Sequence, residues 1–450
     1  MMKILQLHNR YLQRGGEDVV ADQEAELLAD RGHQVVQWIR DNRDELAGPK
    51  GLARRLMLPF TTHYSRKSKR EAERLLRGEK QSNGNSIQNL KVFGSNGFDS
   101  GAGPYDLMHL HNFFPLFTPS VFDAALQAGV PSVMTLHNYR LIHPGATLFH
   151  DGEIDKRSVN GSAWRCVTDG VYRGSMLQTA VVARMIEYHR RKGTWNRVPT
   201  RFIALTEFAK HKLVEGGLPE EKIVVKPNYV EDPGREWAER RMDKLKGESS
   251  KLKGGSPQSK AESSKLKGES GPESQKPYFL FVGRVSREKG VEDLVETWLR
   301  GGLQMELRVA GDGPERKRLK QKAEKNPQIR WLGRLGREQV LEEMAGAAAL
   351  LFPSRWYEGF PMTLLEAFSV GCPAVVTDIG SQAEIVRDGE TGLQVAVGEY
   401  GEMEEVVQRL AGDPELNLKL SRRARKEYEE RFTPERNYER LMEIYEEILS

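Results

Sequence analysis

The chain has few of the features that mark secreted, membrane-spanning or metal–thiolate proteins. Its 450 residues include only two cysteines, Cys166 and Cys372, too few for a disulfide framework or a thiolate metal site. No apolar run approaches the roughly 20 residues that cross a bilayer. The first ten residues, MMKILQLHNR, lack the apolar stretch of a signal peptide. We therefore expect a cytoplasmic protein.

Charge of neither sign is in large excess. The chain has 68 Lys or Arg against 64 Asp or Glu, a net charge of +4, and this balance gives no argument for a nucleic-acid partner. Residues 50–80 are the exception, with ten Lys or Arg against three Glu. Such a run is typical of a solvated helix face, but with Leu52, Leu56 and Met57 it would also suit peripheral contact with anionic lipid. Both interpretations stay open.

Two segments lack the residues of a packed core. Residues 233–276 repeat KLKGES-like motifs among Ser, Gly and Pro, and no aromatic residue occurs from Met242 to Lys276. Such a stretch cannot bury enough apolar surface to offset the cost of ordering it, so we expect a disordered linker insertion. Residues 82–104 are rich in Asn, Gly and Ser, and we expect a surface insertion there.

Alternation of apolar strand patterns with amphipathic helix patterns dominates the rest of the chain. Strands are expected at 3–7, 33–39, 106–111, 132–137, 278–283, 305–311, 329–333, 349–354 and 373–378. The pattern predicts an α/β fold of two Rossmann-like, doubly wound domains with parallel sheets, facing across a cleft. We place the domains at 1–232 and 277–433, with a C-terminal helix at 434–450 crossing back to the first.

The stretch YEGFPMTLLEAF, residues 357–368, holds two glutamates around a predicted helix start. Acidic residues near a helix N-terminus often reflect only its partial positive charge. Here Phe360, Pro361 and Met362 follow a buried strand, and the backbone N–H groups of such a turn suit a phosphate. Glu358 and Glu366 would then accept hydrogen bonds from sugar hydroxyls on either side of it.

The stretch FVGRVSREKG, at the end of the strand expected at 278–283, supplies matching cations. Arg284 and Lys289 lie five positions apart around a tight turn that begins at Gly283. Arginine forks onto phosphate oxygens, while lysine acts as a mobile point charge. Either residue alone could be an ordinary surface cation.

Candidate residues in the first domain carry weaker signals. Gly15 and Gly16 lie between the first strand and the first helix, where a bare backbone can approach a phosphate. His109 and His111 share a strand face, but a metal site would need a third ligand that is not obvious in the sequence. His137 ends the next strand, where it could bond a sugar hydroxyl or be a packed, satisfied histidine.

The whole pattern resembles the glycosyltransferases of family 4, a retaining group with the two-domain GT-B fold. The matching segments are GG at 15–16, TLHNY at 135–139, FIALTEFAK at 202–210, VKPNYV at 225–230, FVGRVSREKGV at 281–291, AGDGP at 310–314 and FPSRWYEGFPMTLLEAFSVGCP at 352–373. The last contains that family's Glu-x7-Glu pattern as Glu358 and Glu366. The resemblance covers nearly the whole chain apart from the two insertions.

The resemblance implies a role for each matching residue. Arg284 and Lys289 would bind the donor diphosphate, Glu366 the nucleotide ribose and Glu358 the donor sugar near the reacting carbon. His137 would lie beside that sugar, and Gly15 and Gly16 would approach the phosphates from the first, acceptor-side domain. Two departures are visible. Pro-Asn-Tyr-Val at 227–230 replaces the usual Pro-Asn-Gly-Val, and the region 143–173 has Cys166 alone where relatives often carry more cysteines, which puts a local metal or thiol role in doubt.

The expected reaction moves a sugar, as in a hexosyltransferase, from a nucleotide diphosphate sugar to a saccharide or lipid-linked acceptor in polysaccharide or glycolipid assembly. No Asp-x-Asp triplet occurs to clamp Mn²⁺ or Mg²⁺, so we expect a metal-independent enzyme without a cofactor, whose fixed cations neutralise the leaving diphosphate. No nucleophile is evident, which favours same-face attack with retention of configuration.

Two rival functions remain. An epimerase or phosphorylase with the same fold would act on the donor without an acceptor. A non-catalytic module recruited to membranes by residues 50–80 would not need the retained Glu358, Arg284 and Lys289. The residues do not identify the sugar, the nucleotide or the acceptor.

Overall fold

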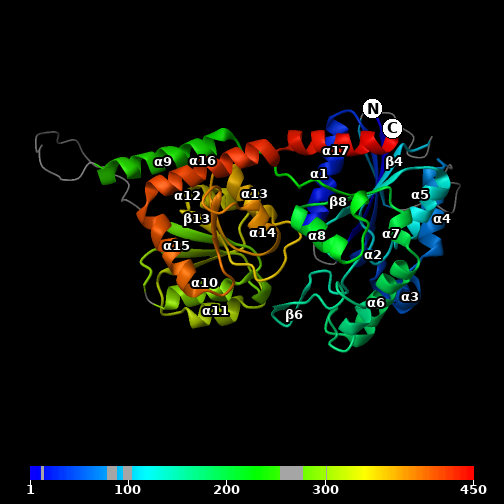
Figure 1. Cartoon of the computed structure of the whole chain (residues 1–450), viewed down its shortest axis with the longest axis horizontal. Helices are drawn as coiled ribbons and strands as arrows, with labels where there is room; N and C mark the ends of the chain where they lie inside the picture. Colours follow the sequence, from blue (N-terminus) through cyan, green and yellow to red (C-terminus); the bar gives the residue numbers. More distant parts are fainter. Residues whose placement is uncertain (12–14, 79–88, 95–103, 254–276, 301) are drawn as a thin grey trace, which may run out of the picture. The chain divides into compact units, whose positions relative to one another are not determined.

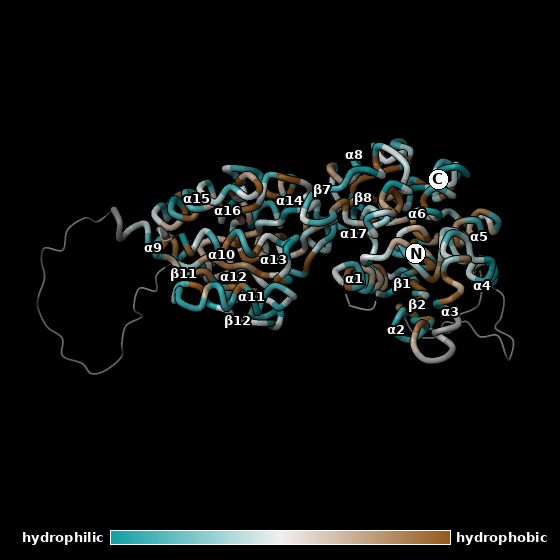
Figure 2. The backbone as a smooth tube through the Cα atoms, turned by 90° about the horizontal axis from the view of Figure 1, so that it is seen from below, coloured by the Kyte–Doolittle hydropathy of each residue, from teal (hydrophilic) through white to brown (hydrophobic). Residues whose placement is uncertain are grey.

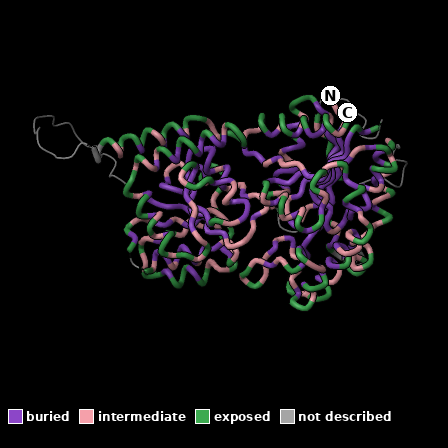
Figure 3. The backbone as a smooth tube through the Cα atoms, viewed as in Figure 1, coloured by how far each residue is buried: buried purple, intermediate pink, exposed green. Residues whose placement is uncertain are grey.

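The computed structural model describes residues 1–11, 15–78, 89–94, 104–253, 277–300 and 302–450. The chain forms two compact units (Figure 1), one of residues 1–228 with 434–450 and the other of residues 229–433. Each unit is an α/β body built on its own sheet. Hydrophobic residues gather along the strands (Figure 2), and those strands are buried while the covering helices expose one side (Figure 3).

The first unit has a seven-stranded sheet in the order β3-β2-β1-β4-β5-β8-β9. Its strands are β1 (Lys3–Arg10), β2 (Gln34–Asp41), β3 (Leu90–Phe93), β4 (Leu107–Asn112), β5 (Ser132–Leu136), β8 (Arg201–Ala204) and β9 (Ile223–Val225). The described helices are α1 (Gly16–Asp30), α2 (Asn42–Glu45), α3 (Gly48–Thr61), α4 (Arg66–Leu76), α5 (Ser120–Ala128), α6 (Met176–Arg191), α7 (Thr194–Arg197), α8 (Glu207–Glu215) and α17 (Pro434–Leu449). A small hairpin joins β6 (Phe149–His150) to β7 (Glu153–Ile154).

Helix α17 completes the core of the first unit, although it follows the second unit in sequence. Leu441, Ile444 and Tyr445 are buried in one cluster with strand residues such as Ile4 and Leu107. The first unit therefore has a core made from both ends of the described chain.

The second unit has a six-stranded parallel sheet in the order β12-β11-β10-β13-β14-β15. Its strands are β10 (Tyr278–Val282), β11 (Glu306–Ala310), β12 (Ile329–Gly333), β13 (Ala349–Phe352), β14 (Ala374–Thr377) and β15 (Gly392–Val395). Its described helices are α9 (Arg235–Lys253), α10 (Val291–Leu299), α11 (Arg316–Lys322), α12 (Arg337–Gly346), α13 (Met362–Ser369), α14 (Gly380–Ile385), α15 (Tyr400–Gly412) and α16 (Pro414–Arg431).

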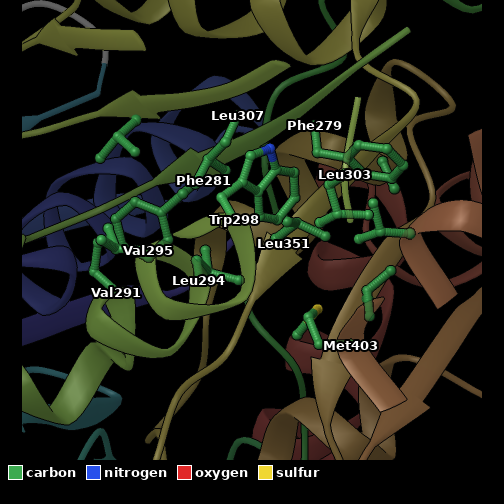
Figure 4. Packing of buried hydrophobic residues seen from close by; sticks show 14 of the residues in the cluster. Phe279, Phe281, Val291, Leu294, Val295, Trp298, Leu303, Leu307, Leu351 and Met403 are labelled. Carbon is green, nitrogen blue, oxygen red and sulfur yellow. The ribbon is translucent and has the colours of Figure 1, made fainter. Parts of the chain in front are cut away.

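Trp298 anchors one side of the second unit's core. Its indole is 1% exposed among Phe279, Leu303 and other apolar side chains (Figure 4), and its Nε1 donates to the carbonyl of Met305 at 2.8 Å. A buried tryptophan contributes a large apolar area while its one polar atom keeps a partner. This packing holds α10, and with it the corner after β10, against the sheet.

Strand order reverses at one point in each sheet. In the second unit β10 lies between β11 and β13, and in the first β1 lies between β2 and β4. Ligands of open α/β sheets bind beyond the carboxyl ends of the strands at such a point. The segments that follow β10, β13, β1 and β4 are therefore the ones to examine.

The predicted α/β fold of two Rossmann-like domains is confirmed, with two local differences. Strand β3 pairs antiparallel with β2, so residues 90–93 extend the first sheet inside the segment expected to be a surface insertion, whose residues 82–88 and 95–103 lie outside the described part. Helix α9 covers residues 235–253 of the segment expected to be disordered, and residues 254–276 lie outside the described part.

Helix α9 docks through a few apolar residues and one buried arginine. Ala238 and Leu245 are buried, and the buried Arg241 donates to the carbonyl of Ala348 at 2.9 Å and to Asn417 at 3.0 Å. The lack of aromatic residues after Met242 carried no signal for a helix that packs on α16, and Trp237 of α9 packs against the core of the second unit. No described helix combines the length and apolarity needed to cross a membrane.

Candidate active site

Glu358 and Lys289 meet in the second unit at the point where strand order reverses. Lys289 Nζ donates to Glu358 Oε1 at 2.6 Å, and Ser354 Oγ donates to the same oxygen at 2.7 Å. Glu358 is only 6% exposed. The ammonium of Lys289 also lies 5.5 Å from the ring centroids of Phe352 and Trp356. Two residues singled out from separate motifs thus form one charged pair.

Gly290 allows this approach. Its φ is +67°, and a Cβ there would lie 1.9 Å from the carbonyl oxygen of Pro353, closer than any side chain permits. Only glycine combines this left-handed backbone with such close contact. The corner after β10 can therefore pack against the strand end of β13, which brings Lys289 to Glu358.

Arg284 lies at the start of the same corner and is more exposed. Its guanidinium donates to Glu288 at 2.6 Å while the side chain keeps 56% of its surface exposed. Burial tends to raise the pKa of Glu288, but hydrogen bonds from Ser286 and the backbone, with the charge of Arg284, hold it below its ordinary value. Gly283 precedes Arg284, and its N–H donates to the carbonyl of Ala310 at 3.0 Å.

The start of α13 presents unpaired backbone donors. Pro361 is the N-cap residue, and its carbonyl accepts from the amide of Leu364 at 3.0 Å. Among the described residues, none accepts a hydrogen bond from the amides of Met362 or Thr363. These donors and the helix dipole form a site suited to an anion. The preceding Phe360 packs edge-on against Phe432.

Glu366 lies one turn further along α13. Burial raises the pKa of its carboxyl, and the charge of Arg337 opposes that shift. Its carboxylate makes no hydrogen bond with any residue that the structure describes. Glu366 is half-buried, so its carboxylate is accessible to a ligand, and it is suited to accept a hydrogen bond from a hydroxyl.

The glycine pair of the first unit caps α1. Gly15 is the N-cap, and its N–H donates to Asp18 Oδ2 at 2.8 Å. The other oxygen of Asp18 lies 2.7 Å from His8 Nε2. Gly16 is exposed in the first turn. The amide of Gly15 is therefore engaged within the loop, and contact of this pair with a phosphate stays a prediction.

His137 follows β5 and ends a buried polar network. Its Nε2 lies 3.1 Å from His111 Nδ1, and His111 Nε2 lies 3.0 Å from Glu24 Oε1. The second oxygen of Glu24 accepts from the buried Lys226 at 3.3 Å. His109, two residues before His111 on β4, also contacts Glu24, with Nδ1 3.0 Å from Oε1.

Glu24 and Lys226 form the buried ion pair of this network. Burial alone would raise the pKa of Glu24, but His109 and Lys226 hold it well below its ordinary value. Burial lowers the pKa of His111 to about 4 and that of His137 well below its ordinary value. Both imidazoles are thus neutral near pH 7, and His137 can exchange hydrogen bonds without adding charge.

Two described groups bring metal-ligand atoms together. Glu24, His109 and His111 form one, with ligand atoms within 4.8 Å of each other. Glu24 is the third ligand that the spacing of the two histidines did not reveal, because it comes from α1. Lys226 already provides a counter-charge for this carboxylate, so the donor set fits a charge network better than a dication site.

The other group is His143, Asp155 and Cys166. Arg157 forks onto both oxygens of Asp155, at 2.9 Å and 2.8 Å, which occupies that carboxylate. Burial raises the pKa of the Cys166 thiol to about 11, so the thiolate that would bind a metal is disfavoured. Neither group gives a donor set that is ready for an ion.

Several residues of these sites carried no sequence signal. Glu288 and Ser354 orient Arg284 and Glu358, but a serine after a strand and a glutamate in a charged turn are too common to single out. Glu17, on the first turn of α1, is a third residue without such a signal. Burial, together with the charge of Asp18, raises its pKa to about 8.

Comparisons with known proteins place both units in one enzyme family. The model for the glycosyl transferase 4-like domain matches residues 15–229, and the model for glycosyl transferases group 1 matches residues 262–427. The chain resembles HepE of Anabaena, which has been solved with UDP and with UDP-glucose. With UDP the TM-score is 0.62 at 15% identity, covering 99% of this chain and 100% of that one. At this identity the likeness concerns the fold, which is GT-B.

Curated relatives match over shorter stretches. An exopolysaccharide phosphotransferase of Streptomyces coelicolor is 36% identical over 148 residues, 32% of this chain and 15% of its own length. An alpha-D-kanosaminyltransferase of Streptomyces kanamyceticus is 30% identical over 155 residues, 33% of this chain and 40% of its own. The chain thus spans less than half the length of either relative. Its two matched domains, which together span most of the described residues, show that it belongs to the GT-B glycosyltransferases that pair a 4-like domain with a group 1 domain.

Proposed function

We propose that this chain transfers a sugar from a nucleotide diphosphate sugar to an acceptor hydroxyl with retention of the anomeric configuration. The observation that carries the proposal is the group of Glu358, Lys289 and Ser354 after β10 and β13, in the same unit as the open amides of α13. The UDP and UDP-glucose complexes of HepE support this class of donor.

The contacts of Lys289 suit a diphosphate. An ammonium has three donors, of which one is used by Glu358. The remaining donors and the amides of Met362 and Thr363 would stabilise negative charge as it grows on the leaving phosphate. Arg284 would exchange part of its bond to Glu288 for phosphate oxygens, as its exposure allows.

The two glutamates would hold hydroxyls on opposite sides of the diphosphate. Glu358 engages Lys289 and Ser354 through Oε1, and its Oε2 makes no hydrogen bond within the described chain. That oxygen would accept from the donor sugar, and Glu366 would accept from the nucleotide ribose. In the first unit, the neutral His137 would bond the donor sugar, and Gly15 and Gly16 would approach its phosphates.

Retention follows from attack on the face that the phosphate leaves. The acceptor oxygen bonds to the anomeric carbon as the bond from that carbon to the phosphate oxygen breaks, and the acceptor proton passes to the departing phosphate oxygen. No enzyme nucleophile, metal ion or cofactor is required in this scheme. A glycosyl–enzyme adduct trapped and detected by mass spectrometry would overturn it.

A screen of nucleotide sugars by thermal shift, followed by hydrolysis assays, tests the donor class. Stabilisation by one nucleotide sugar and slow release of its nucleotide are expected. Glu358→Ala should lose turnover, and Arg284→Ala should lose turnover at low donor concentration, both while remaining folded. Arg330→Ala, which removes another exposed arginine, should lose none. Equal turnover in all three variants would remove the site assignment. Isomerised or phosphorolysed donor without acceptor would favour an epimerase or a phosphorylase.

We propose that the enzyme works in polysaccharide or glycolipid assembly at the cytoplasmic face of a membrane. The basic segment 50–80 supports this, since its described residues include most of α3 and all of α4, with Leu56, Met57 and Phe60 of α3 exposed. Co-sedimentation with anionic vesicles at low and high salt tests the contact. Absence of binding at both salt concentrations would end the idea and leave a solvated basic face.

A further inference from the structure

A mostly apolar pocket of about 520 Å³ lies in the first unit between α3, α6 and the segment after β4. Its wall includes Leu46, Leu58, Pro59, Phe114, Val181 and Val182. The volume lies within the roughly 300–1,000 Å³ of small-molecule sites. None of the residues proposed for the donor lines it.

One end of the pocket lies at the carboxyl edge of the sheet. Tyr11 and Asn42, which line it, directly follow β1 and β2. Phe114 and Tyr172 also line it, and the guanidinium of Arg140 stacks over their rings at 4.5 and 4.8 Å from the centroids. Two polar residues of the pocket thus lie on the edge where ligands of such sheets bind.

The other end opens to solvent between two helices with exposed apolar residues. Leu56 of α3 and Leu177 of α6 line the pocket with 67% and 72% of their surfaces exposed. Their neighbours Met57, Phe60 and Met176 are also exposed. Exposed apolar residues that continue an apolar pocket indicate a binding surface rather than isolated surface side chains.

The charge of the pocket has one sign. Arg55 and Arg173 line it, and no carboxylate occurs among its described lining residues. An apolar pocket with two guanidinium groups complements a ligand that combines a hydrocarbon chain with an anionic group. A neutral saccharide would leave the apolar wall uncovered, and a free phosphate would fill little of the volume.

We propose that this pocket binds the sugar acceptor and that the acceptor is a lipid whose head group carries both a phosphate and the hydroxyl that attacks the donor sugar. Its hydrocarbon chain lies along Leu58, Val181 and Leu177, and its phosphate is held by Arg55 and Arg173. The reacting hydroxyl of its head group points toward Tyr11, at the carboxyl edge of the sheet. The assignment rests on the proposed transferase function, because it names the acceptor of that reaction.

Binding of a soluble probe tests the pocket without any turnover. Decyl phosphate below its micellar concentration is titrated into the full chain by calorimetry, beside decanol and inorganic phosphate. Saturable binding of decyl phosphate is expected, with weaker binding of decanol and none of inorganic phosphate. Failure of decyl phosphate to saturate, or equal binding of decanol, would overturn the proposal.

Two substitutions on exposed positions locate the site. Leu177→Asp should weaken decyl phosphate binding about tenfold, since it removes one leucine's worth of apolar contact, and Arg173→Gln should weaken decyl phosphate more than decanol. Leu126→Asp is the matched control, because Leu126 is an exposed leucine on α5 outside the pocket. Equal effects of Leu177→Asp and Leu126→Asp would contradict the assignment.

Two further arms separate the alternatives. If the chain sediments with phosphatidylglycerol vesicles but does not bind monomeric decyl phosphate, the apolar face is a membrane contact and the acceptor pocket is refuted. Donor binding is measured on the same samples by thermal shift with UDP-sugars. Decyl phosphate binding without donor binding would refute the transferase and keep the lipid site, and the reverse result would refute only the lipid site.

Discussion

The two units use charge in opposite ways at the same place in their sheets. In the first, Glu24, Lys226 and three histidines satisfy one another within the protein. In the second, Lys289 and Glu358 pair with each other while donors and acceptors around them keep unused capacity. A closed network fixes the geometry of one residue at its end, His137, whereas an open one is ready to bind charge. The first unit should thus respond to mutation in stability and the second in binding and turnover.

The largest effect is expected from breaking the closed network. Lys226→Met should destabilise the first unit by about 3–5 kcal/mol, because it leaves the Glu24 carboxylate buried without its cation. Hydrogen exchange of β4 and β5 amides measures this. Adding Glu24→Gln should recover much of the loss, and Lys246→Met, at an exposed lysine, should change nothing. If the β4 and β5 amides of Lys226→Met exchanged as slowly as those of wild type, the proposed contrast between the units would be refuted.

Glu358→Gln should have the largest effect on turnover. The substitution keeps size but removes the charge that holds Lys289, so we expect a 10²–10³-fold loss, comparable to the loss of one preorganised transition-state group. Donor turnover and melting are measured on the same sample. Glu390→Gln, at an exposed glutamate, is the control. A large fall in melting temperature would instead make Glu358 a structural residue.

Arg284→Ala should act mainly through donor affinity. Removing one exposed guanidinium from a diphosphate site should weaken nucleotide binding about tenfold, the scale of one charged hydrogen bond. Titration with UDP measures the change. Arg330→Ala is the control and should bind UDP as wild type does. If Arg284→Ala instead left affinity intact, the bond to Glu288 would be the whole role of Arg284.

The most gradual effect is the pH dependence of the closed network. The folded pKa of His111 is about 4 against an ordinary 6.5, so between these values the unfolded chain binds a proton that the folded chain does not. Stability should therefore fall as pH drops from about 6.5 to 4. The depressed pKa of Glu24 adds its loss only below its ordinary 4.5. Urea unfolding of wild type and His111→Asn, whose slope in this window should be smaller, checks the sign.

Local pattern predicted most elements because the sheets are regular. Strand β12 has the predicted bounds, 329–333, and strand β13 (349–352) begins where predicted. Strand β3 and helix α9 were not predicted, since both depend on a partner surface already present. Periodicity indicates which face of a segment can be buried. It does not indicate whether a neighbouring element is present for a short or weakly apolar segment to pair with or pack on.

The candidate site was predicted as residues more than as contacts. Lys289 and Glu358 came from separate motifs, but their direct pairing depends on Gly290 passing the carbonyl of Pro353. Glu24 was missed because α1 brings it beside β4, and no sequence spacing relates it to His109. Tertiary partners of this kind carry no local signal, whereas residues at strand ends do.

Helix α17 also sets an order of events during synthesis. Leu441, Ile444 and Tyr445 belong to the core of the unit that begins with β1. A ribosome must translate the entire second unit before this helix becomes available. Until then, the apolar surface that α17 covers stays exposed in the nascent first unit. Chaperone dependence should be greatest in that interval and should end when residues 434–450 emerge.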